Sequence, residues 1–379
     1  MNEPTYSVAR TAAAVVDDFF ARHLPPPREA GAPECAPTPE HAMVAAMVDA
    51  AFWASLLREE GRAPRISLAL VAPDRAGEPM RFAHPFPLAA DALTRLAPAV
   101  ERPGIHLGVW PVNGAGLCVW GAARTLPDHC LVLEVVEPGL LVVKYRRGED
   151  SKKFGNVAVL QGDRVRVVDE RSARLPDAPA LLAALLADAP VSWSDARNEL
   201  VQLAVSMRGH GRGGLLLVVP GGTHDWRESI VHPVSYEVSP PFSRLADLLR
   251  LPPPDRGRAG GRDGVPRLID AIAGLTAVDG ATIMSDGYEV LAFGAKIGRR
   301  EGRGPVEQVV VTEPVLDDVP ALVAPTQLGG TRHLSAAQFV HDQPDALALV
   351  ASQDGRFTIF AWSPSEMMVH AHRIEVLLY

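Results

Sequence analysis

Two short motifs in the last third of the chain contain the residue types that a phosphate site needs. Asp279 and Gly280 precede an apolar segment, and further along Gly330, Thr331 and Arg332 precede an alanine-rich one. A carboxylate is a ligand that Mg²⁺ or Mn²⁺ accepts, and a glycine leaves room for a ligand beside the backbone. A glycine turn that enters a helix exposes amide groups to an anion, and arginine adds charged donors. The two motifs together predict a nucleotide site.

Each motif alone has a plainer explanation. Asp279 and Gly280 also suit a turn between two strands, and Thr331 also suits the cap of an ordinary helix with Arg332 and His333 on its surface. Short motifs often match by chance. The prediction therefore rests on the pair, in which Thr331 caps the helix while Arg332 and His333 donate to the anion.

The two motifs resemble the signatures of the diadenylate cyclase domain, which read Asp-Gly-Ala and Gly-Thr-Arg-His-Arg. Residues 279–281 match the first signature, and residues 330–333 match the second up to its last position, where Leu334 stands in place of arginine. After the next apolar segment the family commonly has Ser-Glu-Glu, and this chain has Gln353 at the middle position, where it cannot bind a metal as a carboxylate would. The resemblance covers roughly residues 195–365. With its long preceding region, the chain is similar to the branch labelled DACNV, a probable sensor domain fused to a cyclase-like domain.

This resemblance implies a ligand set and roles for the motif residues. The family condenses two ATP molecules into cyclic di-AMP at sites formed where two subunits face each other, so the resemblance implies a face-to-face homo-oligomer. It implies ATP or a related nucleotide as ligand and Mg²⁺ or Mn²⁺ as cofactor, with Asp279 as the metal ligand. It assigns catalysis to Asp279, Arg332 and His333. It assigns the nucleotide contacts to Gly280, Ala281, Gly330, Thr331, Arg332, His333 and Ser335.

The predicted function is nucleotide signalling. The cyclase-like domain binds ATP or a related nucleotide and condenses two molecules into a cyclic dinucleotide, under control of an N-terminal sensor. Leu334 argues against full activity, because the loss of one charge-assisted phosphate contact costs about 2–4 kcal/mol. Arg299, Arg300, Arg303 and the loop arginines Arg256, Arg258 and Arg262 are candidates to replace that contact. One alternative is an inactive nucleotide sensor that signals through a partner or through oligomerisation. Another is an interaction scaffold that keeps only the fold.

The composition is that of a globular chain. Its 379 residues with 47% hydrophobic content suffice for two domains, and a net charge of -8 argues against a general nucleic-acid binder. The three cysteines have no regular spacing, which suggests reduced thiols. No apolar run marks a signal peptide, and the longest apolar stretch, Ala178 to Ala187, is too short to span a bilayer. We therefore expect a cytoplasmic protein with no membrane partner, and a bacterial one because the resembled family implies it.

The hydrophobic pattern predicts an α+β protein with two domains. Residues 1–190 form the N-terminal domain, in which helices Val8–His23 and His41–Glu60 precede a mainly antiparallel sheet across residues 65–170. Residues 195–379 form the cyclase-like domain, a mixed β-sheet flanked by helices. Its helices are expected near 195–207, 243–250, 267–276 and 334–341, and its strands at 215–219, 281–284, 290–294, 308–312, 346–350 and 357–361.

Two further groups of residues have two interpretations each, one functional and one purely structural. His370 and His372 alternate along a predicted strand and share one face, which suits a metal, but without a third ligand nearby we expect exposed histidines at a sheet edge. Arg256, Arg258 and Arg262 lie in a proline-rich segment that we expect to be a solvated loop. Closure of this loop over phosphates is the alternative.

Overall fold

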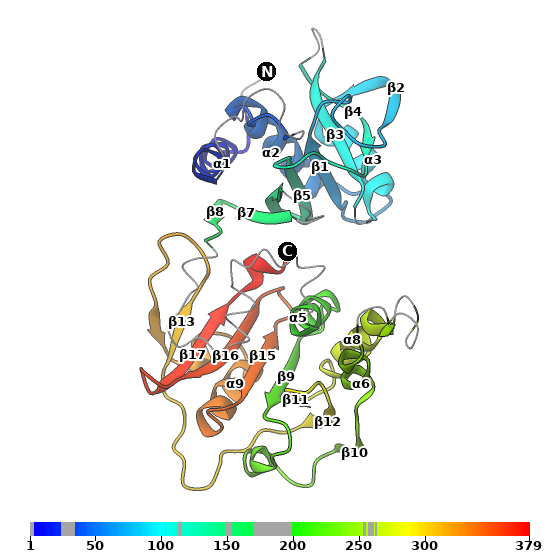
Figure 1. The fold of residues 1–379 in the computed structure, drawn as a ribbon. Helices are drawn as coiled ribbons and strands as arrows, with labels where there is room; N and C mark the ends of the chain where they lie inside the picture. Colours follow the sequence, from blue (N-terminus) through cyan, green and yellow to red (C-terminus); the bar gives the residue numbers. More distant parts are fainter. Residues whose placement is uncertain are drawn as a thin grey trace. The chain divides into compact units, whose positions relative to one another are not determined.

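The computed structural model describes residues 4–23, 35–102, 104–112, 116–148, 154–169, 199–252, 255–256, 261 and 264–379. They form two compact units, the first ending at Asp169 and the second beginning at Glu199 (Figure 1). The apolar stretch Ala178–Ala187 and the predicted domain boundary near residue 190 lie outside the described residues. The same holds for Arg258 and Arg262.

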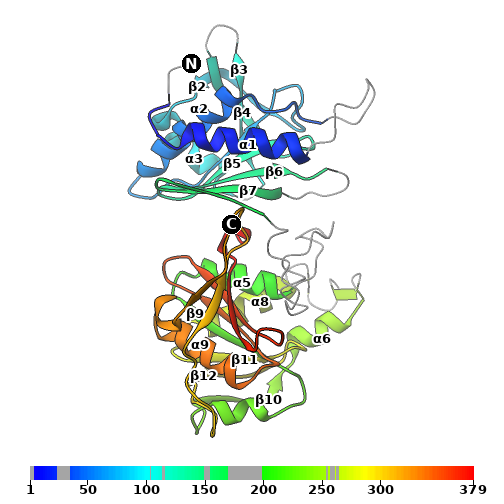
Figure 2. The same cartoon turned by 90° about the vertical axis from the view of Figure 1, so that its left-hand side faces the viewer.

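The first unit is an eight-stranded sheet with helices packed on it. Its helices are α1 (Ala9–His23), α2 (His41–Leu56) and α3 (Ala90–Val100). Its strands are β1 (Ile66–Leu70), β2 (Met80–Pro87), β3 (His106–Val112), β4 (Gly116–Ala123), β5 (Leu131–Glu137), β6 (Leu140–Arg146), β7 (Phe154–Gln161) and β8 (Arg164–Val167). The order is β2-β4-β3-β1-β5-β6-β7-β8, with β1 and β3 parallel and the other neighbours antiparallel. Figure 2 shows α1 lying across this sheet.

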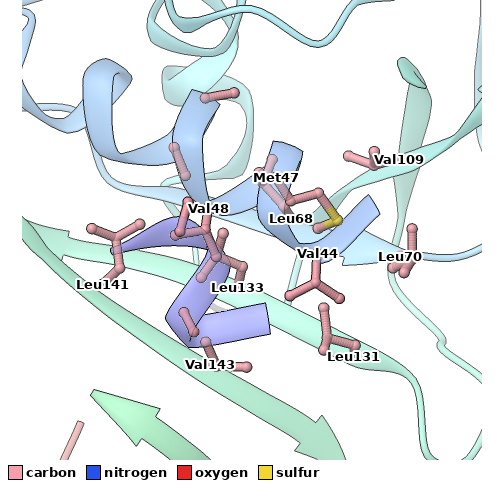
Figure 3. Close-up of a cluster of buried hydrophobic side chains, with 14 of the residues drawn as sticks. Val44, Met47, Val48, Leu68, Leu70, Val109, Leu131, Leu133, Leu141 and Val143 are labelled. Carbon is pink, nitrogen blue, oxygen red and sulfur yellow. The ribbon is translucent and has the colours of Figure 1, made fainter. Parts of the chain in front are cut away.

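The core of the first unit forms where α2 packs on the central strands. Met47 and Val48 of α2 lie among Leu68, Leu133 and Leu141, which come from β1, β5 and β6 (Figure 3). Each of these side chains is at most 1% exposed. Because successive strand residues point to opposite faces, every second leucine or valine of these strands reaches the helices. This alternation is the pattern that predicts the sheet from sequence.

The second unit is a nine-stranded mixed sheet. Its strands are β9 (Gly214–Val219), β10 (Tyr236–Phe242), β11 (Ala281–Ser285), β12 (Val290–Ala295), β13 (Val309–Thr312), β14 (Ala321–Val323), β15 (Leu347–Ala351), β16 (Phe357–Ser363) and β17 (Met368–Arg373). Its helices are α5 (Glu199–Gly209), α6 (Arg244–Arg250), α8 (Gly264–Leu275) and α9 (Thr331–Asp342). The strand order is β10-β12-β11-β9-β15-β16-β17-β13-β14, in which β9 pairs in parallel with β11 and β13 with β17.

Helices cover both faces of the second sheet. Phe339 and Val340 of α9 pack with Leu217 of β9, so α9 lies over one face (Figure 1). Leu216 and Val218 alternate with Leu217 and therefore point to the other face, where both are buried. α5 and α8 pack against each other, and they contact β15 and β12 respectively.

The predicted α+β class with two sheet-rich regions is confirmed. Four helices and strands were not predicted from the sequence pattern. These are β2, α3, β10 and β14. β2 and β10 are edge strands, mostly exposed and interrupted by proline, so they lack the alternation of apolar residues that marks a half-buried strand. α3 contains Pro98, which reads as a helix breaker. The predicted helix from His41 ends at Leu56 rather than at Glu60.

Replacement of Leu133 by alanine is expected to lower the free energy of unfolding of the first unit by about 2–5 kcal/mol, because it leaves a cavity in a closely packed core. Leu56→Ala is the matched control, since Leu56 is 46% exposed at the end of α2 and should cost about 1 kcal/mol or less. Urea unfolding followed by circular dichroism measures both. Equal losses for the two variants would contradict the placement of Leu133.

Candidate functional site

Four adjacent strands of the second sheet bring the two predicted motifs together. β9 and β11 are parallel and begin at the same end of the sheet, whereas β12 and β15 are antiparallel to them and end there. A cavity of about 560 Å³ lies between these strand ends and the first turn of α9. Its lining includes every residue predicted for the site, namely Asp279, Gly280, Ala281, Gly330, Thr331, Arg332, His333 and Ser335.

Asp279 lies two residues before β11 and is paired with a lysine that the sequence analysis missed. The Lys296 ammonium donates to Asp279 Oδ2 over 2.5 Å. This hydrogen bond, the lysine charge and the charge of Arg332 lower the pKa of the Asp279 carboxyl below its ordinary value. The carboxyl is therefore ionised at neutral pH, as a metal ligand must be.

Gly280 allows β11 and β12 to approach closely at this point. Its φ is +113°, and a Cβ there would lie 2.5 Å from the carbonyl carbon of Gly294. In the resulting register Ala281 pairs with Ala295, which brings the next residue, Lys296, beside Asp279. The sequence pattern suggests that Gly280 leaves room for a ligand, and the structure adds a packing reason.

Arg332 enters the cavity from the first turn of α9 and passes the glycine turn before β9. A Cβ on Gly213 would lie 2.9 Å from Arg332 Nη1, so the absence of a side chain there leaves room for the guanidinium group. Gly213 also has a φ of +72°, which favours glycine. The turn thus supports the position of a predicted site residue.

His333 lines the cavity but is buried, with 4% of its surface exposed. Its ring packs against Gly329, where a Cβ would lie 2.5 Å from Nδ1, and meets Phe360 edge to face with 6.1 Å between centroids. Burial lowers the pKa of His333 to about 4, and the nearby charge of Arg373 acts in the same direction. At neutral pH His333 is uncharged, so it offers a hydrogen bond and no positive charge.

The N-terminus of α9 has no side-chain cap. The helix begins at Thr331, and its N-cap residue is Gly330, which has no side-chain oxygen. The prediction that Thr331 caps the helix is wrong, because Thr331 already belongs to the first turn. Both residues line the cavity, and an anion is the partner that the amides of an uncapped helix start attract.

The two departures from the cyclase signatures fall at different places. Leu334 is 38% exposed on α9 and does not line the cavity. Gln353 does line it, together with its neighbour Asp354 and with Arg356, all from the turn between β15 and β16. Arg356 Nε lies 3.3 Å from Asp354 Oδ2. The cavity therefore has a second arginine, Arg356, which lies two residues after Asp354 and was not predicted for the site.

The arginines suggested as replacements for the missing one lie elsewhere. Arg299, Arg300 and Arg303 are not part of the lining, and Arg300 Nε pairs with Glu228 Oε2 at 2.7 Å. Arg256 donates from Nε to the Leu251 carbonyl at the end of α6. None of these four described arginines lines the cavity.

The charges of the described lining favour an anion. Lys296, Arg332 and Arg356 are cationic, whereas Asp279 and Asp354 are the two carboxylates, which leaves a surplus of one positive charge. Among the described residues no group of three or more His, Cys, Asp or Glu side chains could hold a metal alone. Mg²⁺ at nucleotide sites is commonly held by one or two carboxylates together with substrate phosphates, and Asp279 fits that arrangement.

His370 and His372 are not exposed edge residues, so that expectation is wrong. β17 lies between β16 and β13, and the two histidines are 5% and 3% exposed. His372 Nδ1 lies 2.7 Å from the hydroxyl of Thr312, and His370 Nε2 lies 3.0 Å from a carboxylate oxygen of Glu366. Pairing with β13, which is distant in sequence, buries them.

Comparison with known proteins supports one part of the family resemblance. Residues 33–124 match the family model described as "Probable sensor domain DACNV". This supports the DACNV family for a segment of the first unit, and the match does not extend to the cyclase-like region. Comparison with curated proteins gives no match.

One solved structure is similar to this chain only at a distant level. It is described as a hypothetical membrane spanning protein from Bacillus cereus, with 14% identity and a TM-score of 0.29 over 53% of this chain and 72% of that one. A likeness this low supports no conclusion about fold or function. In the described part of the chain, no helix combines the length and apolar character needed to cross a membrane.

Replacement of Gly280 by alanine is expected to destabilise the second unit by about 1–3 kcal/mol or more, since it combines an unfavourable φ with a backbone clash. Gly274→Ala is the control. Gly274 is exposed in α8 with nothing within 4 Å of a Cβ, so alanine should be neutral or stabilise by up to about 1 kcal/mol. Thermal unfolding compares the two, and equal behaviour would contradict the close approach of β11 and β12.

His333 is expected to make the second unit less stable in mild acid. The pKa of His333 is about 4 in the folded chain, and its ordinary value is 6.5. Between these two pH values the unfolded chain binds more protons than the folded chain, so the stability falls as the pH falls. Above pH 6.5 the protonation of His333 does not reduce the free energy of unfolding. As the pH falls toward 4, this free energy decreases by about 3 kcal/mol. Urea unfolding across this range should show a shallower pH dependence for His333→Gln, and an unchanged slope would contradict the burial of His333.

Proposed function

We propose that the second unit binds ATP or a related nucleotide in this cavity and condenses two nucleotides into a cyclic dinucleotide. The observation that carries the proposal is the convergence of residues 279–281 and 330–333 on one cavity with a cationic surplus. A cavity of about 560 Å³ falls within the usual range for small-molecule sites. The uncapped start of α9 adds an attraction for phosphate.

The cavity residues divide into phosphate-binding and metal-binding groups. The guanidinium of Arg332 and the amides at Gly330 and Thr331 hold phosphate oxygens, and neutral His333 adds a hydrogen-bond donor. Asp279, ionised and largely exposed, holds Mg²⁺ or Mn²⁺ that binds with the nucleotide. The divalent cation supplies neutralisation of phosphate charge. Positioning and charge neutralisation are the main contributions a protein makes to phosphoryl transfer.

The first unit has the role of a sensor in this proposal, and the matched segment at residues 33–124 supports that role. The nucleotide site lies in the second unit, so the sensor controls catalysis from a separate part of the chain. Pairing of two cyclase-like units face to face follows from the resemblance to the cyclase family. This pairing brings two nucleotides together.

A second candidate is a nucleotide sensor without catalysis. Two observations favour it: residue 334 is a leucine, and Gln353 lines the cavity where the family has a glutamate. Both candidates require nucleotide binding, and they differ in whether nucleotide is consumed.

Incubation of the full chain with ATP and Mn²⁺ is expected to yield a cyclic dinucleotide, detected by mass spectrometry. Asp279→Asn should abolish the product, because a neutral amide holds the metal poorly. Arg332→Ala should weaken nucleotide binding by about 10- to 100-fold, since it removes a charge-assisted hydrogen bond. Calorimetric titration measures the binding.

Arg299→Met is the control for both measurements. Arg299 is an exposed cation close in sequence to the site but outside the cavity lining, so its loss should change neither product nor affinity. Binding without product would favour the sensor over the cyclase. Nucleotide affinity that is equal in the wild type, Arg332→Ala and Arg299→Met would contradict a nucleotide site in this cavity.

A further inference from the structure

The ion pair between Lys296 and Asp279 is a feature of the cavity that the cyclase signatures do not account for. The ammonium lies 2.5 Å from Asp279 Oδ2, and the two side chains are 55% and 91% exposed. The backbone register of β11 on β12 keeps the two residues together. An exposed ion pair contributes little to stability and is screened by salt, so other ions readily exchange with it.

Asp279 and Lys296 each gain another binding partner when a polyphosphate enters the cavity. The carboxylate of Asp279 is the group proposed to hold the divalent cation. The ammonium of Lys296 is a compact charge on a flexible stem, which suits a phosphate whose position varies. A lysine ammonium and a divalent cation repel each other at close range, so the two do not share one carboxylate without cost.

The other carboxylate of the cavity, Asp354, is paired with a cation from its own turn. Asp354 pairs with Arg356 within a single short turn, where the Ser352 amide also donates to the Arg356 carbonyl over 2.9 Å. Lys296 and Asp279 come from two different strand ends. Both side chains are mostly exposed, so rotation about their own bonds separates them without a change in either strand.

We propose that Lys296 is an exchangeable counter-cation of Asp279. It holds the carboxylate in the empty cavity, and when a nucleotide binds it transfers its ammonium to a phosphate and leaves Asp279 to the divalent cation. This inference rests on the proposed function and deepens it. Its consequence is that Lys296 substitutes in part for the metal, so nucleotide binding without metal depends on Lys296 far more than binding with metal does.

The test is calorimetric titration of the full chain with α,β-methylene ATP, whose carbon bridge prevents condensation, in EDTA and in excess Mg²⁺. Lys296→Met should weaken binding by about 10-fold or more in EDTA, through the loss of a charged phosphate contact. In Mg²⁺ the loss should be about threefold or less, because Asp279 is free for the metal from the start. Lys296→Arg should restore most of the metal-free affinity, and Arg299→Met is the control expected to change neither value.

Three outcomes would overturn the inference. Equal weakening of Lys296→Met with and without Mg²⁺ would make Lys296 an ordinary phosphate contact, and no weakening in either condition would make the ion pair a surface feature. Both leave the proposed function intact, because the wild type still binds. Failure of the wild type to bind the analogue in either condition would overturn the proposed function and the inference together. Circular dichroism confirms that each variant is folded.

Discussion

The close approach of Gly280 to Gly294 is the constraint on which the candidate site depends. A Cβ on Gly280 would lie 2.5 Å from the backbone of β12, so the register that pairs Ala281 with Ala295 requires glycine. That register brings the end of β12 to the start of β11 and sets Lys296 beside Asp279. The parallel pairing of β9 with β11 and the antiparallel pairing of β15 with β9 then add two more strand ends to the same edge. The chemistry of the cavity is thus a consequence of strand pairing.

The polar residues at these strand ends differ in how far they are buried, and this difference sets their charge and their pairing. His333 is held behind Gly329 and against Phe360, so the cost of desolvation keeps it neutral. Asp279 and Lys296 remain in water, where their pairing is weak enough to exchange. The replacement at Leu334 lies outside the lining, so the cationic surplus of the cavity comes from other positions. Arg356 lies two residues beyond the segment that corresponds to the Ser-Glu-Glu signature.

The two parts of the proposed function, sensing and nucleotide binding, are assigned to different units of the chain. The segment that matches the sensor family, residues 33–124, runs from before α2 to the end of β4. The sheet of the first unit continues beyond it through β5 to β8, and α2 packs its core partly on β5 and β6. The fold of the first unit therefore includes strands outside the matched segment. The candidate site, by contrast, is built wholly from residues of the second unit.

Local pattern was enough to predict the α+β class, and it singled out the motif residues that line the cavity. Alternating apolar residues mark a half-buried strand wherever it lies, and a glycine beside an acid or a Thr-Arg-His sequence is visible without neighbours. The partners of those motifs were not predictable in this way. Lys296 directly follows β12 and Arg356 lies in the turn between β15 and β16, but only the strand order shows that both positions lie near Asp279. The same reason explains the error at His370 and His372, because β13, which buries them, is distant in sequence. Propensity acts between neighbours in the chain, whereas burial, ionisation and ion pairing depend on residues that meet only after folding.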